Sequence, residues 1–523
     1  MQSCISQRRL RLLYALAALA VLGALLLPAA AGAQKAGVKP QSTADTFFRM
    51  WHGFARNAQH TAQAIAASQP FTRIKWQTPM DLNPQYSGSE LLIHYGSPIT
   101  TDNDTLIIPV KTGATDGFQI EAHRNTDGSL LYTLPTDYTL PPHNWTPSYG
   151  PALRFDELIY PGAGGTIYIR TRASETKGKV TQLAFYGLSN YQANPSAYNS
   201  TVFICTPLTV DVHGNLYFGF VVTGSNPINL TGGLARISRD GVGSWVSAAA
   251  ATGDGGVDHV QYNSAPAVSP DGATVYACFT NGFYGYLVGL NSSTLATIYP
   301  ATQLTNPVPL LDPVSGYDAL IIDDSTSSPS IGPNGDVYFG VLEDPFPYNN
   351  DRGWLLHFDK TLATAKTPGA FGWDYTAAFV PSEAVPSYKG KSHYLIACKY
   401  NNYIQFANGE NKVAVLDPFA TETDPVTGGT VMNEVLTMLG QTANPAGGVD
   451  EWCINTMAVD PFTKSILVNS EDGKLYRWDL TTNTLSEKMT LTAGLGEAYT
   501  PTVVGGDGTV YAINNAIIFA IGR

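Results

Sequence analysis

The segment YTPTVVGGDGTVYAINNAIIFAI, Tyr499–Ile521, decides the fold. It contains three runs of β-favouring residues, Val503–Val504, Val510–Tyr511 and Ile517–Ile521, and the first two are separated by Asp507–Gly508. An Asp-Gly pair between hydrophobic runs is a strong hairpin signal, because glycine accepts the positive φ that tight turns need. The segment therefore predicts three short antiparallel strands joined by tight turns.

The same pattern of an X-Pro step, a turn ending in glycine and a hydrophobic pair recurs along the chain. Three further copies are Thr206-Pro207 with His213-Gly214 and Leu216-Tyr217, Ala265-Pro266 with Asp271-Gly272 and Val275-Tyr276, and Ser328-Pro329 with Asn334-Gly335 and Val337-Tyr338. Repeats spaced by tens of residues are typical of solenoids and propellers. Eight inner strands are predicted to begin at Pro98, Pro151, Pro207, Pro266, Pro329, Phe379–Pro381, Thr456 and Pro501.

The end of the chain indicates how such a ring would close. The sequence ends two residues after the third strand of the last unit, so that unit lacks a fourth strand, while Arg73–Gln77 is a spare strand before the first unit. Pairing the two would remove the exposed sheet edges. We therefore predict an all-β, eight-bladed β-propeller of four-stranded antiparallel blades, closed by an N-terminal strand and spanning residues 73–523. The alternative is seven blades, because the sixth unit, with Pro381 and Pro386, is the least regular.

Residues 1–33 have the pattern of a secretory signal peptide. Arg8, Arg9 and Arg11 precede the apolar run Leu12–Leu27, and Ala31-Gly32-Ala33 is a small-residue cleavage site. No later run reaches the roughly 18 apolar residues of a membrane span. We expect a periplasmic or secreted protein, with a polar tail and a lead-in segment at residues 34–72 and no membrane span after signal cleavage.

The composition suits a turn-rich globular protein with an acidic surface. The formal net charge is −12, and loss of the three signal arginines would make the chain more acidic still. An acidic surface argues against nucleic acid as a partner. With 50 Gly, 34 Pro and 44% hydrophobic residues, the chain can fill a β-rich core. We expect a monomer.

Four cysteines follow the signal segment: Cys205, Cys278, Cys398 and Cys453. They are isolated in the sequence and lie in or beside strands of different repeats. A disulfide is possible in an exported protein, but the spacing favours four buried thiols.

The lead-in segment carries a resemblance to a known family. Trp51, Phe54 and Asn57-x-Gln59-His60-Thr61, followed by Ile74-Lys75-Trp76, resemble the start of pyrroloquinoline-quinone-like (quinoprotein-type) β-propellers, and the downstream repeat resembles the same family. The resemblance implies the propeller fold over nearly all of the mature chain. It also implies what a quinone-dependent dehydrogenase would carry: two adjacent cysteines, acidic and amide ligands for calcium, and a tryptophan below the quinone. No two cysteines are adjacent here, so we expect no cofactor, with calcium and pyrroloquinoline quinone as the alternatives.

The candidate binding residues come from their register in the repeat. In a propeller, the loops that lead into the inner strands lie on one face beside the mouth of the channel, which we call the mouth face; the Asp/Asn-Gly turns lie on the opposite, turn face. An acid, an amide or an aromatic residue recurs before nearly every inner strand: His94, Tyr95, Asn144, Trp145, Tyr198, Asn199, Asp258, His259, Asp323, Asp324, Trp373, Asp374, Asp450, Glu451, Trp452, Glu497 and Tyr499. Aromatic faces stack on apolar ring surfaces while carboxylates and amides bind hydroxyls. The competing interpretation is that the tryptophans wedge between blades and the acids cap turns.

Two functions remain open from the sequence. The first is a non-catalytic exported propeller that binds a carbohydrate-like ligand or an envelope protein on the mouth face. The alternative is a quinoprotein-like dehydrogenase or another enzyme that uses the same face, with Asp258 and His259 as an acid–base pair. Adjacent residues on an extended segment point in opposite directions, so these two side chains need not share a site. Fold alone does not choose between the two functions.

Overall fold

The computed structural model describes residues 51–87, 90–91, 96–142, 149–307, 318–323, 325–344, 349–403, 407–494 and 501–523. All of them belong to one compact unit, Ser42–Arg523. The predicted signal peptide and most of the polar tail lie outside the described residues. In the part of the chain that the structure describes, no helix combines the length and the apolar character needed to cross a bilayer.

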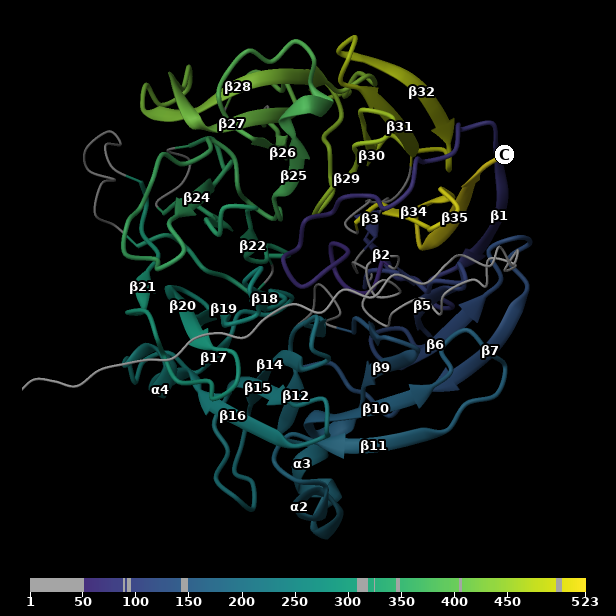
Figure 1. The fold of residues 1–523 in the computed structure, drawn as a ribbon, viewed down its shortest axis with the longest axis vertical. Coiled ribbons are helices and arrows are strands. Elements are labelled where there is room, and N and C mark those ends of the chain that lie inside the picture. Colours follow the sequence, from purple (N-terminus) through teal and green to yellow (C-terminus); the bar gives the residue numbers. More distant parts are fainter. Residues whose placement is uncertain are drawn as a thin grey trace, which may run out of the picture. The chain divides into compact units, whose positions relative to one another are not determined.

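Eight antiparallel sheets are arranged in a ring, one for each predicted repeat, and form the blades of a β-propeller (Figure 1). Blades 1 and 2 contain β4 (Ile99–Thr100), β5 (Leu106–Lys111), β6 (Phe118–His123) and β7 (Leu130–Pro135), then β8 (Ala152–Arg154), β9 (Glu157–Pro161), β10 (Thr166–Thr171) and β11 (Val180–Ala184). Blade 3 contains β12 (Val202–Ile204), β13 (Thr209–Val210), β14 (Leu216–Val222), β15 (Gly233–Ile237) and β16 (Gly243–Ser247). Blade 4 contains β17 (His259–Val260), β18 (Ala267–Val268), β19 (Thr274–Thr280), β20 (Gly285–Asn291) and β21 (Thr302–Gln303).

The second half of the ring repeats this plan. Blade 5 contains β22 (Ser330–Ile331), β23 (Val337–Val341) and β24 (Trp354–Phe358), and blade 6 contains β25 (Ala378–Pro381), β26 (Tyr394–Tyr400), β27 (Lys412–Thr423) and β28 (Thr430–Leu439). Blade 7 contains β29 (Ala458–Asp460), β30 (Ser465–Asn469), β31 (Lys474–Asp479) and β32 (Thr484–Thr490), and blade 8 contains β33 (Val503–Val504), β34 (Val510–Asn514), β35 (Ile517–Gly522) and β1 (Arg73–Pro79). Outside the blades are the hairpin β2 (Tyr86–Ser87) and β3 (Glu90–Leu91) and the short helices η1 (Ala163–Gly165), α2 (Leu188–Ala193), α3 (Pro195–Asn199), α4 (Ala248–Thr252) and η2 (Ser382–Ala384).

Three blades depart from a plain four-stranded sheet. In blades 3 and 4 the innermost strand is broken in two, so that β12 and β13 both pair with β14, and β17 and β18 both pair with β19. In blade 5 the fourth position is occupied by an irregular segment that touches β24 through two isolated bridges, Leu355 with Gly369 and Phe358 with Ala365. The eight-bladed prediction is thus confirmed over its seven-bladed alternative. The least regular blade is the fifth, whereas the sixth has four full strands.

The ring closes as predicted, between the two ends of the propeller sequence. β1 pairs antiparallel with β35, from Arg73 opposite Gly522 to Pro79 opposite Ile517. Trp76 of β1 is buried at 9% exposure, and its indole N–H donates to the carbonyl of Asn125 in blade 1 at 2.7 Å. The closing strand therefore also fastens blade 8 to blade 1.

The lead-in segment forms a second closure inside the ring. Residues 51–69, which we call the inner strap, run along the inner strands of the blades (Figure 1). Backbone hydrogen bonds join the strap to seven blades in order: Thr100 N to Trp51 O, Leu153 N to His52 O, Val268 N to Ala58 O, Ile331 N to Gln59 O, Phe379 N to Thr61 O, Val459 N to Ala62 O, and Gln69 N to Gly508 O, at 2.7–3.1 Å. At blade 3, Gly53 of the strap lies against the carbonyl of Leu208, a residue between β12 and β13. The strap is thus a belt of backbone hydrogen bonds around the inner wall.

The core consists of the second and third strands of each blade together with aromatic residues between blades. β5, β19, β23 and β26 are buried along their whole length. Trp354, Trp452 and Trp478 are fully buried. None of the four described cysteines is in a disulfide bond and all four are buried, which confirms the prediction of buried thiols.

The turns of the turn face have the structural role that the sequence predicts. Gly214, Gly272, Gly335 and Gly508 all have positive φ, between 71° and 89°. The preceding acids and amides bind their own turns: Asp507 accepts from Thr509 N at 2.8 Å, and Asn334 accepts from Asp336 N at 3.0 Å. These side chains therefore help to hold the turns.

Candidate functional site

The predicted residues of the mouth face fall into three sets. Seven lie outside the described residues: His94, Tyr95, Asn144, Trp145, Asp324, Glu497 and Tyr499. Five are wholly or partly buried: Tyr198, Asp374 and Trp452 are buried, and Asn199 and Trp373 are half-buried. The other five form two groups on the mouth face, one around His259 and one around Glu451.

The first group is an imidazole held between two carboxylates from neighbouring blades. Asp258 and His259 lead into blade 4, and Asp323 leads into blade 5. His259 Nδ1 lies 2.5 Å from Asp258 Oδ1, and its Nε2 lies 3.1 Å from both carboxylate oxygens of Asp323. Asp258 precedes the strand, because β17 begins only at His259, so the alternation of an extended strand does not separate the two side chains. The structure therefore brings together a pair whose contact the sequence left open.

Exposure differs sharply across this group. The side chain of His259 is 8% exposed, that of Asp323 22% and that of Asp258 76%. Asp323 is further fixed by the backbone N–H of Tyr262, which donates to its Oδ1 at 3.1 Å. The ring of Tyr262 lies edge-on to the imidazole, with centroids 5.1 Å apart. The result is an exposed carboxylate, Asp258, whose orientation is set by a buried ring.

The electrostatics of the group favour a charged imidazolium. Burial lowers the pKa of His259, but the hydrogen bonds and charges of Asp258 and Asp323 outweigh it and raise the pKa to about 9. The hydrogen bond to His259 in turn lowers the pKa of Asp258. At neutral pH both ring nitrogens are protonated and donate to carboxylates. His259 is therefore not available as a general base.

The second group surrounds Glu451, in the segment that leads into blade 7. Asn401 Nδ2 donates to Glu451 Oε2 at 3.3 Å, and Asn401 also binds the backbone of Trp452. Burial raises the pKa of Glu451, while the nearby ammonium of Lys399 and a hydrogen bond from Tyr403 act in the opposite direction. Asp450, on the other side, is partly exposed, and burial together with the charge of Asp472 raises its pKa.

Sequence reasoning missed Lys399 and Asn401 as members of this group. Lys399 lies in β26, the run Tyr394–Tyr400, and is 2% exposed. Its ammonium nitrogen lies 5.5 Å from the centre of the Phe371 ring. One signal could have found it: a lysine inside a run that is otherwise apolar or aromatic is unusual unless the charge is used.

The remaining described candidates are held in the packing. Trp452 is fully buried and packs edge-on against Tyr476, with centroids 5.6 Å apart. Tyr198 is fully buried and stacks on Tyr186 at 4.6 Å, in a helical insertion before blade 3. Asp374 accepts from both Thr326 N and Thr326 Oγ1 at 2.6 Å. These geometries agree with the wedge-and-cap interpretation for these residues.

Two features of the described residues differ from the quinone site that the family resemblance implies. No two cysteines are adjacent, so a vicinal disulfide cannot form, and the side chain of Trp452 is fully buried. Among the residues that the structure describes, no group of three metal-ligating side chains is arranged to hold a metal ion. We therefore derive no step through either group.

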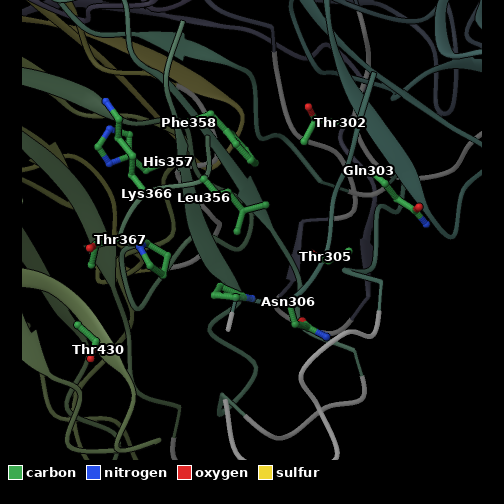
Figure 2. Close-up of a pocket in the computed structure, with 13 residues that line it drawn as sticks. Thr302, Gln303, Thr305, Asn306, Leu356, His357, Phe358, Lys366, Thr367 and Thr430 are labelled. Atoms are coloured by element: carbon green, nitrogen blue, oxygen red, sulfur yellow. The ribbon is translucent and has the colours of Figure 1, made fainter. Parts of the chain in front are cut away.

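A cavity of about 580 Å³ lies away from the mouth-face groups, at the irregular outer edge of blade 5. Figure 2 shows Leu356 and Phe358 pointing from β24 to one side of it, with Thr302 and Asn306 opposite. His357, the residue between them, turns the other way and binds Asp336 at 2.9 Å. None of the described residues that the sequence marks as ligand-binding lines this cavity. The cavity exists because blade 5 has an irregular segment in place of a fourth strand.

Comparison with known proteins shows the fold. No protein-family model and no curated protein sequence matches the chain. A europium-containing methanol dehydrogenase superimposes with a TM-score of 0.54 at 9% sequence identity, covering 89% of this chain and 89% of that one. Sqt1 of Saccharomyces cerevisiae superimposes with a TM-score of 0.51 at 10% identity, covering 87% of this chain and 99% of Sqt1. The chain thus has a β-propeller fold, which it shares with a dehydrogenase and with Sqt1.

Proposed function

We propose that this protein is an exported binding propeller without a catalytic step of its own, and that a carbohydrate-like ligand or an envelope protein binds to its mouth face. One observation carries the proposal: the Asp258 carboxylate is 76% exposed while the ring that orients it is buried and held from both sides. An acceptor that is both ordered and accessible binds hydroxyl or amide donors with little loss of side-chain entropy.

The contrast between the two faces supports this placement. On the turn face the acids and amides accept hydrogen bonds from their own turns, as Asp271 does from Ala273 N at 3.0 Å. On the mouth face, Asp258 is exposed and is oriented by His259, and Asp450 is partly exposed. The exposed acid that a neighbouring buried ring orients thus lies on the mouth face.

The raised pKa of His259 argues against this residue as a general base in the enzymatic alternative. A general base must hold an open lone pair near the working pH, and an imidazole with a pKa of about 9 does not. For the quinoprotein-like form, the described residues give no support. Export is part of the proposal and rests on the signal-like pattern of residues 1–33.

The test replaces one exposed acid on each face. We expect Asp258→Asn to melt within a few degrees of the parent, because an exposed substitution costs about 0.5 kcal/mol or less. Its binding to at least one member of a panel of plant and bacterial polysaccharides should fall tenfold or more in calorimetric titration. The matched control is Asp271→Asn on the turn face, which should keep both stability and binding.

Two results would contradict the proposal. Unchanged binding by Asp258→Asn would show that the mouth face is not the site. If the parent bound no polysaccharide, the carbohydrate version would fail, and pull-down with Asp258→Asn as bait would decide whether an envelope protein uses that face.

A further inference from the structure

The most exposed large hydrophobic side chain among the described residues lies on the mouth face. It is Phe283, in the loop between β19 and β20, and it is 71% exposed. The loop belongs to the mouth face because Thr280, where β19 ends, is the sheet partner of His259. At this exposure the ring contributes little to the core, so folding alone gives no reason for an aromatic residue at this position.

The loop that carries Phe283 is held in place by hydrogen bonds of its own. Asn281 Oδ1 accepts from the backbone N–H groups of Phe283 and Tyr284 at 3.1 and 3.2 Å. Ile321, in the segment that leads into blade 5, donates its N–H to the carbonyl of Phe283 at 2.9 Å. The backbone is therefore fixed on both sides of the ring, and a contact made by the ring costs little conformational entropy.

Three carboxylates lie around this loop. Each is joined to it by a short contact: Asp258 N to Thr280 O at 3.3 Å, Asp323 Oδ2 to the place where a Cβ would stand on Gly282 at 3.6 Å, and Asp254 Oδ2 to the Tyr284 hydroxyl at 3.0 Å. Among the described residues, the imidazolium of His259 is the one cation that contacts these acids. We call Phe283 and the three acids the blade-4 patch, and its net charge is negative.

The sequence around the blade-4 patch supplies no compensating positive charge. Between Arg239 and Arg352 there is no lysine or arginine and His259 is the single histidine, whereas aspartate recurs throughout this stretch, which contains all of blade 4. A surface of one sign attracts partners of the opposite charge over a Debye length of about 10 Å at ordinary ionic strength. The patch therefore favours a cationic partner.

We infer that the blade-4 patch binds a partner protein through a segment in which apolar side chains stand next to lysine or arginine. The inference rests on the proposed function and specifies its envelope-protein version. The Phe283 ring packs against the apolar side chains of the partner, and Asp258, which His259 orients, accepts from the basic side chain. A protruding aromatic anchor with a polar rim is typical of protein–protein interfaces.

The charge of the patch argues against a lipid surface as the occupant. An exposed aromatic ring also suits the interface of a membrane. Anionic lipid headgroups, however, attract basic residues and repel acids, and the residues around Phe283 are acids. A basic protein segment satisfies both the ring and the carboxylates.

The experiment measures the binding of three synthetic peptides by fluorescence anisotropy. The peptides share their leucine positions and carry arginine, glutamine or glutamate at the positions between them. We expect the parent to bind the arginine peptide at least about tenfold more tightly than the other two, with a preference that weakens as the salt concentration rises. Phe283→Ser should weaken this binding about tenfold or more, because the ring is the apolar anchor. Asp258→Asn should reduce the preference for arginine.

Phe462→Ser is the matched control. Phe462 is also exposed, at 61%, but it lies on the turn face, between β29 and β30, with Lys464 two residues away. This variant should bind the arginine peptide as the parent does. All three variants should melt within a few degrees of the parent, because the replaced side chains are exposed.

Several outcomes would overturn the inference and leave the proposed function standing. Equal affinity for the three peptides would remove the requirement for positive charge. Unchanged binding by Phe283→Ser, or an equal loss in Phe462→Ser, would show that the patch is not the contact surface. A marked fall in the melting temperature of Phe283→Ser would make the ring a packing element. Binding to vesicles of phosphatidylethanolamine and phosphatidylglycerol in place of the peptides would assign the patch to a membrane.

The polysaccharide panel separates failure of this inference from failure of the proposed function. If the parent binds a polysaccharide but none of the three peptides, this inference fails and the carbohydrate version stands. If it binds neither peptides nor polysaccharides, and the pull-down with Asp258→Asn as bait recovers the same proteins as the parent, both fail.

Discussion

Two buried histidines, one in the inner strap and one on the mouth face, show how differently the two regions are built. His60 of the strap is 1% exposed, and its Nδ1–H donates to the carbonyl of Pro329 at 2.6 Å. Burial lowers the pKa of His60 to about 4, although the hydrogen bond to Pro329 raises it slightly. His259 is 7% exposed, but two carboxylates hold its pKa at about 9. Similar burial therefore gives a neutral ring in the strap and a cation on the mouth face.

The difference teaches what each region is for. The strap surrounds its histidine with backbone and apolar side chains, such as Phe54 at 5.2 Å, so the ring is a packing element. The mouth face surrounds its histidine with charge and leaves one carboxylate in solvent. A buried imidazole is a structural part in the first case and the support of an exposed acid in the second.

The largest effect is expected from deleting the inner strap together with most of β1. Deleting residues 51–77 would remove the belt that joins seven blades and also β1, which closes blade 8. The loss should exceed the 5–15 kcal/mol that stabilises a typical domain, so we expect aggregation or no cooperative unfolding transition. Thermal melting followed by circular dichroism measures the unfolding transition. Deletion of residues 34–50 is the control and should leave the transition unchanged. A truncated protein with an unchanged melting temperature would show that neither element closes the ring.

The mouth face should lose stability on the alkaline side. The folded pKa of His259, about 9, lies above the unfolded value of 6.5, so the folded state binds the proton more tightly. Its contribution is complete below about pH 6.5 and is lost as pH rises to about 9, a loss on the order of 3 kcal/mol. The free energy of unfolding, measured by urea titration, should fall less steeply between pH 6 and pH 9.5 for His259→Gln than for the parent. The exposed His213→Gln is the control, and equal slopes for His259→Gln and parent would refute the charged imidazolium.

Titration of His60 in the strap should lower the stability of the protein at acid pH. At pH values where the protein remains folded, this loss should be smaller than the loss expected from His259 at alkaline pH. The folded pKa of His60, about 4, lies below the unfolded value of 6.5, so the unfolded state binds the proton more tightly. Stability is lost as pH falls from about 6.5 toward 4, and roughly half of that loss is expected by pH 5. His60→Gln should flatten the decline between pH 6.5 and 5 in the same urea series. A parallel decline in both proteins would mean that His60 titrates normally.

The fold could be predicted from the sequence because the turn and strand signals of each blade lie within one short segment of the chain. Asp507–Gly508 and its counterparts fix a turn with positive φ, and the hydrophobic run on either side fixes a strand, so the predicted pairs Val337-Tyr338 and Val510–Tyr511 begin β23 and β34. The break of the inner strand in blades 3 and 4 was not predictable, because β12 and β17 pair over only two or three residues and carry no turn signal.

The site could be predicted only in part, because its contacts join residues far apart in the sequence. The register marked Asp258, His259 and Asp323 as candidates, but not that Asp323 reaches His259 across 64 residues. It also marked Trp452 and Tyr198, whose buried positions depend on neighbouring blades. Lys399 was passed over because it lies within a strand, where the register of the loops gives no information.

The inner strap also determines the order in which the molecule can be assembled. Each blade is made of neighbouring segments and can form its hairpins through local contacts. The strap belongs to no single blade: Gln69 accepts a hydrogen bond from Arg523, 454 residues away, and Trp51 binds Thr100 only 49 residues away. All of its hydrogen-bond partners are in place only when the inner strands of all the blades have formed. The segment that precedes every blade in the sequence therefore has its full set of hydrogen-bond partners only after the last blade has formed.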